Sequence, residues 1–435
     1  MAINQQDVLK GVAELRDLRA RIHRDIMAQL NFKAIDQVSP EQFRQQIGNM
    51  VYNIVDHQEI PFNQQEREAL VQEMQDEILG YGPIEPLLRD PTVNDILVNT
   101  YRIVYVERRG VLEKTAVAFQ SNEHLRRIIE KIASSVGRRI DESTPMVDAR
   151  LTDGSRVNAV IPPLAIDGPM LSIRKFAVDP YKVNDLIRFR SMTPAIAEFL
   201  SAAVKARVSI LISGGTGAGK TTMLNVVSGF IPPNERIITI EDSAELQLQQ
   251  PHVGRLETRP PNIEGRGEVR QRELVRNALR MRPDRIIIGE VRGDEAMDML
   301  QAMNTGHDGS LTTIHANSAR DGLTRLEHMV GMSGLPMPIH VVRAQIASAI
   351  NLVIQTERLA DGRRVVVSVS EITGMEQDVV NMHEIFTFVR KGVNAKGQMC
   401  GEFRATGIRP HMLKRFHERG IKMDESVFDP EKVYE

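Results

Sequence analysis

The sequence has one cysteine, Cys400, no tryptophan, and aromatic side chains at only 4% of its 435 positions. A single cysteine excludes an internal disulfide and any zinc site built from several thiolates, and it fits a reducing compartment. Few aromatic residues leave few surfaces on which the bases of single-stranded nucleic acid could stack. The composition therefore argues against disulfide-stapled, zinc-ribbon and single-strand-binding proteins.

Neither sign of charge is in excess, since 55 Lys and Arg residues face 57 Asp and Glu residues and the formal net charge is −2. Proteins that bind nucleic acid are usually basic overall or in one domain, so we expect no nucleic-acid partner. No apolar run approaches the ~18 residues of a membrane span. The N-terminal stretch MAINQQDVLKGVAELRD has no apolar signal-peptide core. We expect a cytoplasmic protein without a membrane span.

The length predicts roughly two to four domains. Residues 1–79 carry three apolar stripes of helical spacing, the later two preceded by helix-start signals at 39–42 and 63–66. They predict a three-helix bundle that is either a docking module for a partner or a structural brace. A break at Gly80–Pro83, where we expect few contacts to cross, leads into an α+β domain at 80–190.

Residues 191–435 alternate short apolar runs with helical patterns, which predicts a mostly parallel sheet with helices on both faces. The runs Val208–Ile212, Ile237–Ile240, Ile286–Ile288 and Leu311–Ile314 show no polar alternation, as expected of strands buried on both sides. The fold class is therefore α/β in this region, and a C-terminal tail completes it.

The strongest motif is GGTGAGKT at Gly214–Thr221, which matches the P-loop pattern between an apolar strand and a helical segment. Its glycines let backbone N–H groups surround phosphates at a helix N-terminus. Lys220 is expected to contact the β- and γ-phosphates, and Thr221 to offer its hydroxyl to Mg²⁺. ATP and Mg²⁺ are thus the predicted cofactors of a RecA-like domain. The predicted nucleotide-binding residues here are Gly214, Gly215, Thr216, Gly217, Ala218, Gly219, Lys220, Thr221 and Thr222.

Two further strands deliver carboxylates. The run RIIIGE ends in Glu290, and TIEDSAE, at 239–245, is a strand that runs into an acidic segment. Hydrolysis of a phosphoanhydride needs Mg²⁺ coordination and a group that orients water. The two strand ends could divide these tasks, with Glu290 either serving Mg²⁺ or polarising the water.

His307 and His315 flank another strand, and metal ligation is the first role to consider for them. They lack a third soft ligand or a helical spacing for zinc, so they are either sensors of the γ-phosphate or ordinary hydrogen-bonded histidines. Ten arginines lie between Arg255 and Arg292, interleaved with acidic residues. Most are expected to be paired or solvated, and one or two could reach a neighbouring subunit's phosphates.

The segments GGTGAGKTT, TIEDSAELQL, RPDRIIIGEVRG and TGHDGSLTTIHANS, in this order, resemble the nucleotide-site boxes of the ATPases that drive type II and type IV secretion and type IV pili. Outside them, GYGPIEPLL, DARLTDGSRVNAVIPP and LSIRKF resemble the CpaF-like motor ATPases of the tight-adherence (Tad) pilus. The similarity spans about residues 78–390. It implies a homo-hexameric ATPase, peripheral at the inner membrane, that works with pilus platform proteins.

The resemblance also implies roles for single residues. Lys220 and Thr221 become the Walker A pair, Glu290 closes the Walker B strand, and Glu245 takes the position of the general base. His307 and His315 fill the histidine box. The matching motifs of the middle domain supply the arginines expected to close over the nucleotide, Arg150, Arg156 and Arg174.

Other functions fit parts of the sequence. Within the family, an ATPase for effector or DNA export is the alternative to pilus assembly. A RecA-like helicase or DNA translocase would share the P-loop, but the neutral charge and the strand ending Gly289-Glu290 argue against it. A catalytically silent scaffold is disfavoured because the residues expected to act in hydrolysis are intact: Lys220, Thr221, Glu245 and Glu290. The spacing of His307 and His315 is wider than in the retraction motors, which argues against a dedicated retraction role. The type II secretion branch usually carries a four-cysteine zinc subdomain, and the single Cys400 excludes one here.

Overall fold

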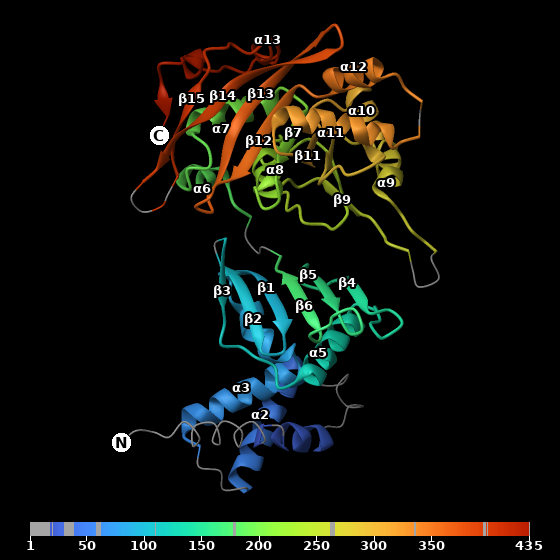
Figure 1. Ribbon diagram of the computed structural model, residues 1–435, viewed down its shortest axis with the longest axis vertical. Coiled ribbons are helices and arrows are strands. Elements are labelled where there is room, and N and C mark those ends of the chain that lie inside the picture. The colour runs from blue at the N-terminus through green and yellow to red at the C-terminus, as the bar shows by residue number, and fades with distance from the viewer. Residues whose placement is uncertain are drawn as a thin grey trace. The chain divides into compact units, whose positions relative to one another are not determined.

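The computed structural model describes residues 18–19, 21–29, 39–57, 62–108, 110–176, 180–261, 266–334, 336–394, 397 and 399–434. The chain divides into two compact units, Met1–Ala177 and Val178–Glu435 (Figure 1). This division lies before residue 190, where the sequence placed the end of the middle domain. The reason is that Leu186, on helix α6, packs in the core of the second unit.

Helices open the first unit. Asn63 caps the third helical segment in a capping box with Glu66, and Ser39 and Gln42 exchange hydrogen bonds of 3.2 and 3.3 Å at the start of the second. The apolar faces form one core from Ile22, Ile26, Phe43, Ile47, Val51, Ile54, Val55, Leu70 and Met74. The expected helix before Leu18 lies outside the described residues. The helical segments are residues 21–29, α2 (Pro40–His57) and α3 (Gln64–Ile78).

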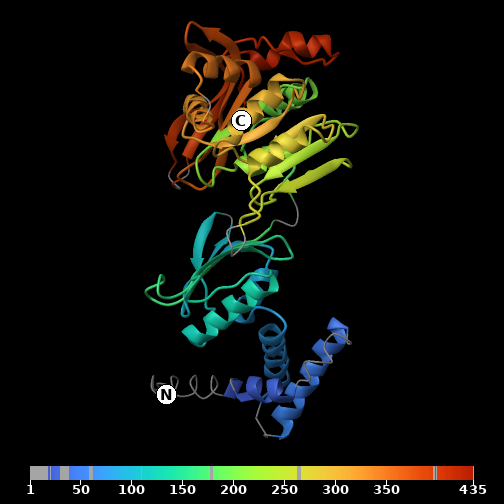
Figure 2. The same ribbon diagram turned by 90° about the vertical axis from the view of Figure 1, so that its right-hand side faces the viewer.

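A six-stranded antiparallel sheet with the order β3-β2-β1-β6-β5-β4 completes the first unit. Alternate residues of its strands are buried, and α5 covers that buried face through Leu125, Ile129 and Ile132 (Figure 2). The opposite face of the strands is more exposed, and it mixes polar residues with the exposed Met146 and Met170. The elements are η2 (Gly82–Ile84), α4 (Glu85–Arg89), β1 (Val93–Thr100), β2 (Ile103–Arg108), β3 (Val111–Lys114), α5 (Asn122–Ser135), β4 (Met146–Arg150), β5 (Arg156–Val160) and β6 (Met170–Arg174).

The junction between α3 and the sheet domain carries more contacts than the sequence suggested. The Lys131 ammonium, on α5, donates hydrogen bonds to the carbonyl oxygens of Glu77, Ile78 and Gly80, at 3.3, 2.8 and 2.6 Å. His124 Nε2 lies 2.7 Å from a carboxylate oxygen of Glu77, and the His124 side chain is 2% exposed. The C-terminal carbonyls of a helix lack partners within the helix, so a cation from α5 satisfies them and ties α3 to the sheet domain.

The second unit is built on a ten-stranded sheet in the order β16-β15-β14-β13-β12-β7-β11-β10-β8-β9. The strands from β12 to β9 are parallel, and those from β12 to β16 are antiparallel. The sequence predicted the parallel part. The strands are β7 (Ile210–Gly214), β8 (Ile237–Glu241), β9 (Val253–Glu257), β10 (Arg285–Ile288), β11 (Leu311–His315), β12 (Leu352–Arg358), β13 (Arg364–Glu376), β14 (Val379–Val393), β15 (Met399–Ala405) and β16 (Val433–Tyr434).

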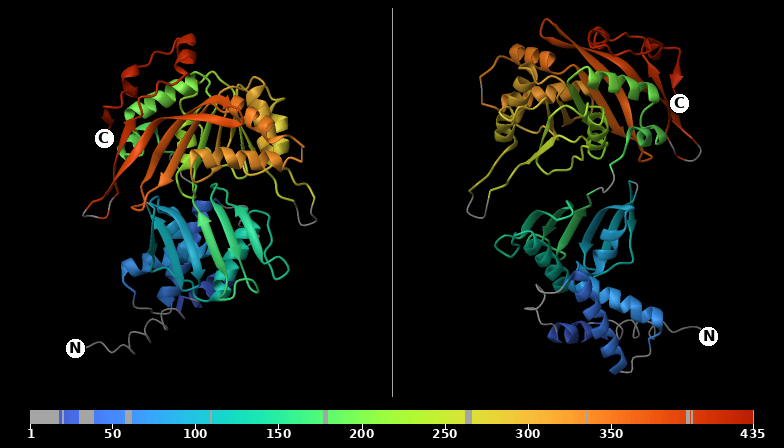
Figure 3. Two further views of the ribbon diagram at one scale, coloured as in Figure 1. Left: turned by 45° about the horizontal axis from the view of Figure 1, so that its top comes forward. Right: turned by 180° about the vertical axis from the view of Figure 1, so that it is seen from behind.

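Helices cover both faces of this sheet (Figure 3). Along β7, Ile210 and Ile212 pack on one side with α7 and α8, whereas Leu211 packs on the other with α10 and α11. This alternation explains why the apolar run of the strand is unbroken. The helices are α6 (Val183–Arg188), α7 (Pro194–Lys205), α8 (Lys220–Ser228), α9 (Gln271–Ala278), α10 (Glu295–Asn304), α11 (Ala319–Gly331), α12 (Ile339–Ala349), α13 (Leu413–Glu418) and η3 (Glu425–Phe428).

Among the described residues, no helix combines the length and the apolar character that crossing a membrane requires.

Candidate active site

The P-loop lies between β7 and α8, as the sequence predicted. Gly217 and Gly219 have φ angles of 68° and 90°, a region that only glycine enters at little cost. The Lys220 ammonium and the backbone N–H of Ala218 both donate to the carbonyl oxygen of Gly215, at 3.1 and 3.3 Å. Two donors therefore converge on one oxygen inside the loop, which is the arrangement that a phosphate oxygen requires.

Strand pairing places other groups beside this loop. Gly214, at the end of β7, pairs with His315 of β11 on one side and with Thr356 of β12 on the other. Because β8, β10 and β11 are parallel to β7, their carboxyl ends meet at the same edge. Glu241 ends β8 there, and Glu290 follows β10 by two residues. Thr221 and Thr222 lie in the first turn of α8, next to Lys220, while Thr216 is exposed in the loop.

A group of cations surrounds the loop. Burial lowers the pKa of Lys220, and the charges of Arg292 and Arg325 lower it further, whereas Glu290 opposes the shift. Burial also lowers the pKa of His315, followed by the charge of Lys220. His315 is therefore a neutral imidazole at pH 7. Concentrated positive charge beside a P-loop stabilises bound phosphate.

In the segment from 255 to 292, ion pairs with carboxylates are made by Arg270, Arg272, Arg276, Arg285 and Arg292. Arg292 joins two acidic elements, because its guanidinium lies 2.6 Å from Glu290 and 3.2 Å from Asp242. Arg272 and Arg276 both bind Asp298. The expectation that most arginines of this segment are paired or solvated agrees with these contacts and with the exposure of Arg280 and Arg282. Arg292 links the end of β10 to the acidic segment after β8.

The acidic segment is held by Glu241, which the sequence analysis did not select. One carboxylate oxygen of Glu241 accepts hydrogen bonds from the backbone N–H groups of Glu245 and Leu246, at 2.6 and 2.8 Å. The other, Oε1, has no hydrogen-bond partner among the described residues. The side chain fits closely against Gly289, where a Cβ would lie 3.0 Å from Glu241 Cγ. Glu241 therefore sets the backbone that carries Glu245. Its position at a strand end was the only sequence signal.

The buried Glu241 carboxyl predicts a pH-dependent stability. Glu241 is 3% exposed, and burial raises its pKa from 4.5 to about 7. The unfolded chain loses this proton near pH 4.5, so the folded state holds more protons between pH 4.5 and 7, and stability falls as the pH rises through this range. Glu241→Gln should remove the cost of burying an ionised carboxylate. It should therefore stabilise the protein at pH 8 by about 3 kcal/mol at most, with no gain at pH 4, where the carboxyl is protonated in the folded state.

Urea unfolding at pH 4 and pH 8 measures this effect. Glu198→Gln, at an exposed position of α7, is the matched control and should change neither value. An equal effect of Glu241→Gln at both pH values would contradict the assignment.

The two predicted histidines are not brought together. β11 runs from Leu311 to His315, so His307 precedes the strand and lies at the amino edge of the sheet, away from the P-loop. There its Nδ1 lies 3.3 Å from the carbonyl oxygen of Ala302, and its own carbonyl accepts from Ser310. Within this unit the whole of β11 separates His307 from His315, and the sensor role expected of His307 stays a prediction.

The three arginines predicted in the first unit do lie together. Arg150 pairs with Arg156 across β4 and β5, and Arg156 pairs with Arg174 across β5 and β6. Directly paired residues of antiparallel strands point to the same face, so the three guanidinium groups form a row. Arg174 also lies 3.1 Å from Asp95. Like charges placed opposite one another cost stability, and the Asp95 carboxylate offsets part of this cost at Arg174.

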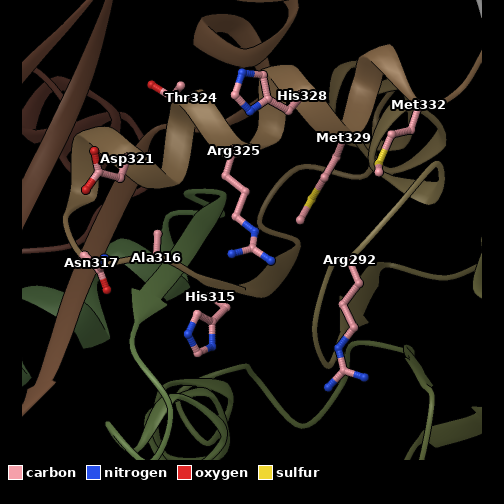
Figure 4. A pocket seen from close by; sticks show the side chains of 10 residues that line it. All are labelled: Arg292, His315, Ala316, Asn317, Asp321, Thr324, Arg325, His328, Met329 and Met332. Atoms are coloured by element: carbon pink, nitrogen blue, oxygen red, sulfur yellow. The ribbon is translucent and has the colours of Figure 1, made fainter.

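A cavity of about 430 Å³ opens beside His315 and α11. Figure 4 shows the Arg325 guanidinium, from α11, directed towards His315, and Arg292 at the right of the same pocket. Arg325 was not predicted from the sequence, because it lies on a helix outside the recognised motifs. Its charge contributes to the lowered pKa of both Lys220 and His315. The cavity is lined by Arg292, His315, Ala316, Asn317, Asp321, Thr324, Arg325, His328, Met329 and Met332.

Comparison with known proteins shows the family to which this chain is similar. Residues 77–403 match the family described as type II/IV secretion system protein, and residues 15–79 match the family described as type II secretion system protein E, N-terminal domain. A Mycobacterium tuberculosis protein named for conjugal transfer is 39% identical over 297 residues, which are 67% of this chain and 84% of that protein. The type IV secretion system protein PtlH of Bordetella pertussis is 36% identical over 303 residues, covering 64% of this chain and 89% of PtlH.

Solved structures also align with the chain. The VirB11 ATPase of the Brucella suis type IV secretion system is 29% identical, with a TM-score of 0.37. The alignment covers 66% of this chain and 95% of the VirB11 chain. The pilus retraction motor PilT with bound ADP is 20% identical, with a TM-score of 0.47. The alignment covers 66% of this chain and 80% of the PilT chain.

Proposed function

The chain belongs to the type II/IV secretion system protein family and is an ATP hydrolase, and we propose that it powers assembly of a tight-adherence pilus. The convergence of Lys220, Glu290 and the acidic segment at one edge of the second unit's sheet carries the catalytic part of this proposal. The middle-domain segments GYGPIEPLL, DARLTDGSRVNAVIPP and LSIRKF support the choice of pilus.

The P-loop fits ATP with Mg²⁺. The convergence of Lys220 and Ala218 N–H on one oxygen matches a phosphate, and Thr221 begins the helix where a metal-ligating hydroxyl is needed. Mg²⁺, when bound, neutralises phosphate charge and holds the phosphate oxygens in place. Thr221 and Glu290 would hold it, Glu290 through water. Lys220 stabilises the charge of the terminal phosphates, and neutral His315 can donate a hydrogen bond beside them.

We assign different tasks to the two glutamates. Glu245 is held by Glu241 through its backbone N–H, so its carboxylate is positioned to orient the attacking water. Glu290 is fixed by Arg292 at 2.6 Å and lies near Lys220, which suits a metal-associated carboxylate.

Glu245→Gln should therefore retain ATP binding and lose turnover by about a hundredfold or more, because an amide cannot accept the proton of water. Glu290→Gln should lose turnover with a shifted Mg²⁺ requirement. Nucleotide affinity and Mg²⁺ titration of both variants measure this, with Glu198→Gln as the control. The reverse pattern would exchange the two roles.

The arginine row supports a site completed by the smaller domain. We propose that Arg150, Arg156 and Arg174 bind nucleotide phosphates when the domains close, in a homo-hexamer whose members close in turn. Static light scattering with and without ATP tests the assembly. A fully active monomer would rule out the hexameric part of the proposal.

Residues 1–79 are proposed to dock onto an inner-membrane platform or a regulatory partner, which would place the ATPase peripherally at the inner membrane. The match of residues 15–79 to an N-terminal domain of secretion proteins supports a role in attachment. Lys131 and His124, on α5, bind Ile78 and Glu77 and so fasten this segment to the sheet domain. A partner that docks on residues 1–79 can therefore shift the sheet that carries the three arginines.

Deletion of the gene tests the cargo. We expect surface pili to disappear and to return with the wild-type gene, but not with a Lys220→Ala gene. The relatives named for conjugal transfer favour a second candidate, an ATPase for type IV export. Loss of DNA transfer or effector release with pili intact would replace the pilus assignment by this one.

A further inference from the structure

The hairpin of β12 and β13 lies against the P-loop. β12 continues beside β7, where Thr356 pairs with Gly214, and the chain then turns back so that Arg358 pairs with Arg364. A Cβ on Gly217 would lie 3.7 Å from Arg358 Nη1, and a Cβ on Gly219 would lie 3.2 Å from Arg364 Cδ. Two arginines thus flank the two glycines whose positive φ angles shape the loop.

One of them contacts the loop directly. Arg364 Nε donates a hydrogen bond of 2.9 Å to the carbonyl oxygen of Gly217. The N–H of the same peptide belongs to Ala218, and it is directed to the carbonyl oxygen that also accepts from Lys220. The C=O and N–H of a trans peptide point in opposite directions. Fixing the Gly217 carbonyl outside the loop therefore aims the Ala218 N–H into it.

The hairpin is held rigidly enough to do this. Leu359 is 4% exposed and lies in the core, and its N–H donates to the Arg363 carbonyl at 2.8 Å. The Asp361 carboxylate accepts from Arg363 and from the backbone N–H of Met399 on β15, each at 2.9 Å. The turn is thus fastened to β15, which lies beyond β14 in the sheet, so Arg364 starts from a fixed backbone.

We propose that Arg364 is a positioning residue that preorganises the P-loop for nucleotide phosphates, and that Arg358 adds positive charge at the same turn. Without Arg364 the Gly217–Ala218 peptide, flanked by glycine, is free to rotate. For part of the time the Ala218 N–H then points away from the phosphate and cannot donate to it. A bound anion also relieves the repulsion between two arginines that lie opposite each other. The inference rests on ATP binding at this loop and not on the cargo that the ATPase moves.

Nucleotide affinity and steady-state kinetics of Arg364→Ala test the inference. We expect the Kd values for ATP and ADP to rise about tenfold, the size of one lost charge-assisted hydrogen bond, while kcat at saturating ATP changes less than about twofold. Arg364→Lys can still donate to the carbonyl and should restore most of the affinity. Arg409→Ala, an exposed arginine near the C-terminus, is the matched control and should leave Kd unchanged.

Thermal unfolding separates positioning from a general loss of structure. Without nucleotide, Arg364→Ala should melt close to wild type, and the stabilisation by ADP should shrink in line with the weaker Kd. An unchanged Kd for Arg364→Ala, or a rise matched by a lower melting temperature without nucleotide, would overturn the inference. Failure of the wild-type protein to bind ATP would instead overturn the assignment of the P-loop itself.

Discussion

Replacing Lys220 by alanine is expected to abolish ATP hydrolysis. The ammonium reaches into the P-loop and donates to the Gly215 carbonyl, where a phosphate oxygen would otherwise accept. Charge on the terminal phosphates increases as the bond to the leaving group breaks, so this cation stabilises the transition state more than the bound substrate. We expect kcat to fall by at least about a hundredfold, which corresponds to about 3 kcal/mol in the barrier.

A coupled assay of phosphate release measures this loss. The fold should survive, because the Lys220 ammonium donates to a carbonyl of its own loop and not to a group in the core. Lys205→Ala, an exposed lysine at the end of α7, is the matched control and should keep wild-type activity. Residual turnover above about a tenth of wild type would show that another group supplies the charge.

Replacing Arg285 by alanine is expected to destabilise the second unit by about 3–5 kcal/mol. This side chain is fully buried at the start of β10, and its guanidinium binds both carboxylate oxygens of Glu235, at 2.6 and 3.2 Å. It also donates to the carbonyl oxygens of Val204 and Gly309, at 2.8 and 3.1 Å. Removing it leaves a buried carboxylate and two buried carbonyls without these bonds.

Urea unfolding of the full chain measures the effect, and the double variant Arg285→Met with Glu235→Met supplies the test. An apolar pair leaves no buried charge, so the double variant should be more stable than Arg285→Ala. Arg280→Ala, an exposed arginine nearby in sequence, should change stability by less than about 0.5 kcal/mol. Equal losses for Arg280→Ala and Arg285→Ala would contradict the role of burial.

These two residues show what a local pattern can reveal. Lys220 was identified from the sequence because a P-loop is continuous, and its chemistry depends on the order of glycine, lysine and threonine along the chain. Arg285 belongs to an arginine-rich segment and has no local sign of burial. Its partners come from three separate parts of the chain: Glu235 precedes β8, Val204 lies on α7 and Gly309 precedes β11.

The active site divides in the same way. Parallel strands place their carboxyl ends at one edge, so the sequence was enough to group Glu290 and the acidic segment with the P-loop. Glu241 and Arg325 were not found, because the role of Glu241 depends on burial and that of Arg325 on the packing of α11. His307 and His315 lie at opposite ends of β11, because the five extended residues of this strand separate them.

The sequence alone determined the P-loop, the alternation of strands and helices in the second unit, and the capped starts of α2 and α3, because these depend on residues close together in the chain. Tertiary structure decided the row of Arg150, Arg156 and Arg174, the fastening of α3 by Lys131, and the contact of Arg364 with Gly217. Each of these joins residues distant in sequence, and only strand register and packing fix which distant side chains meet.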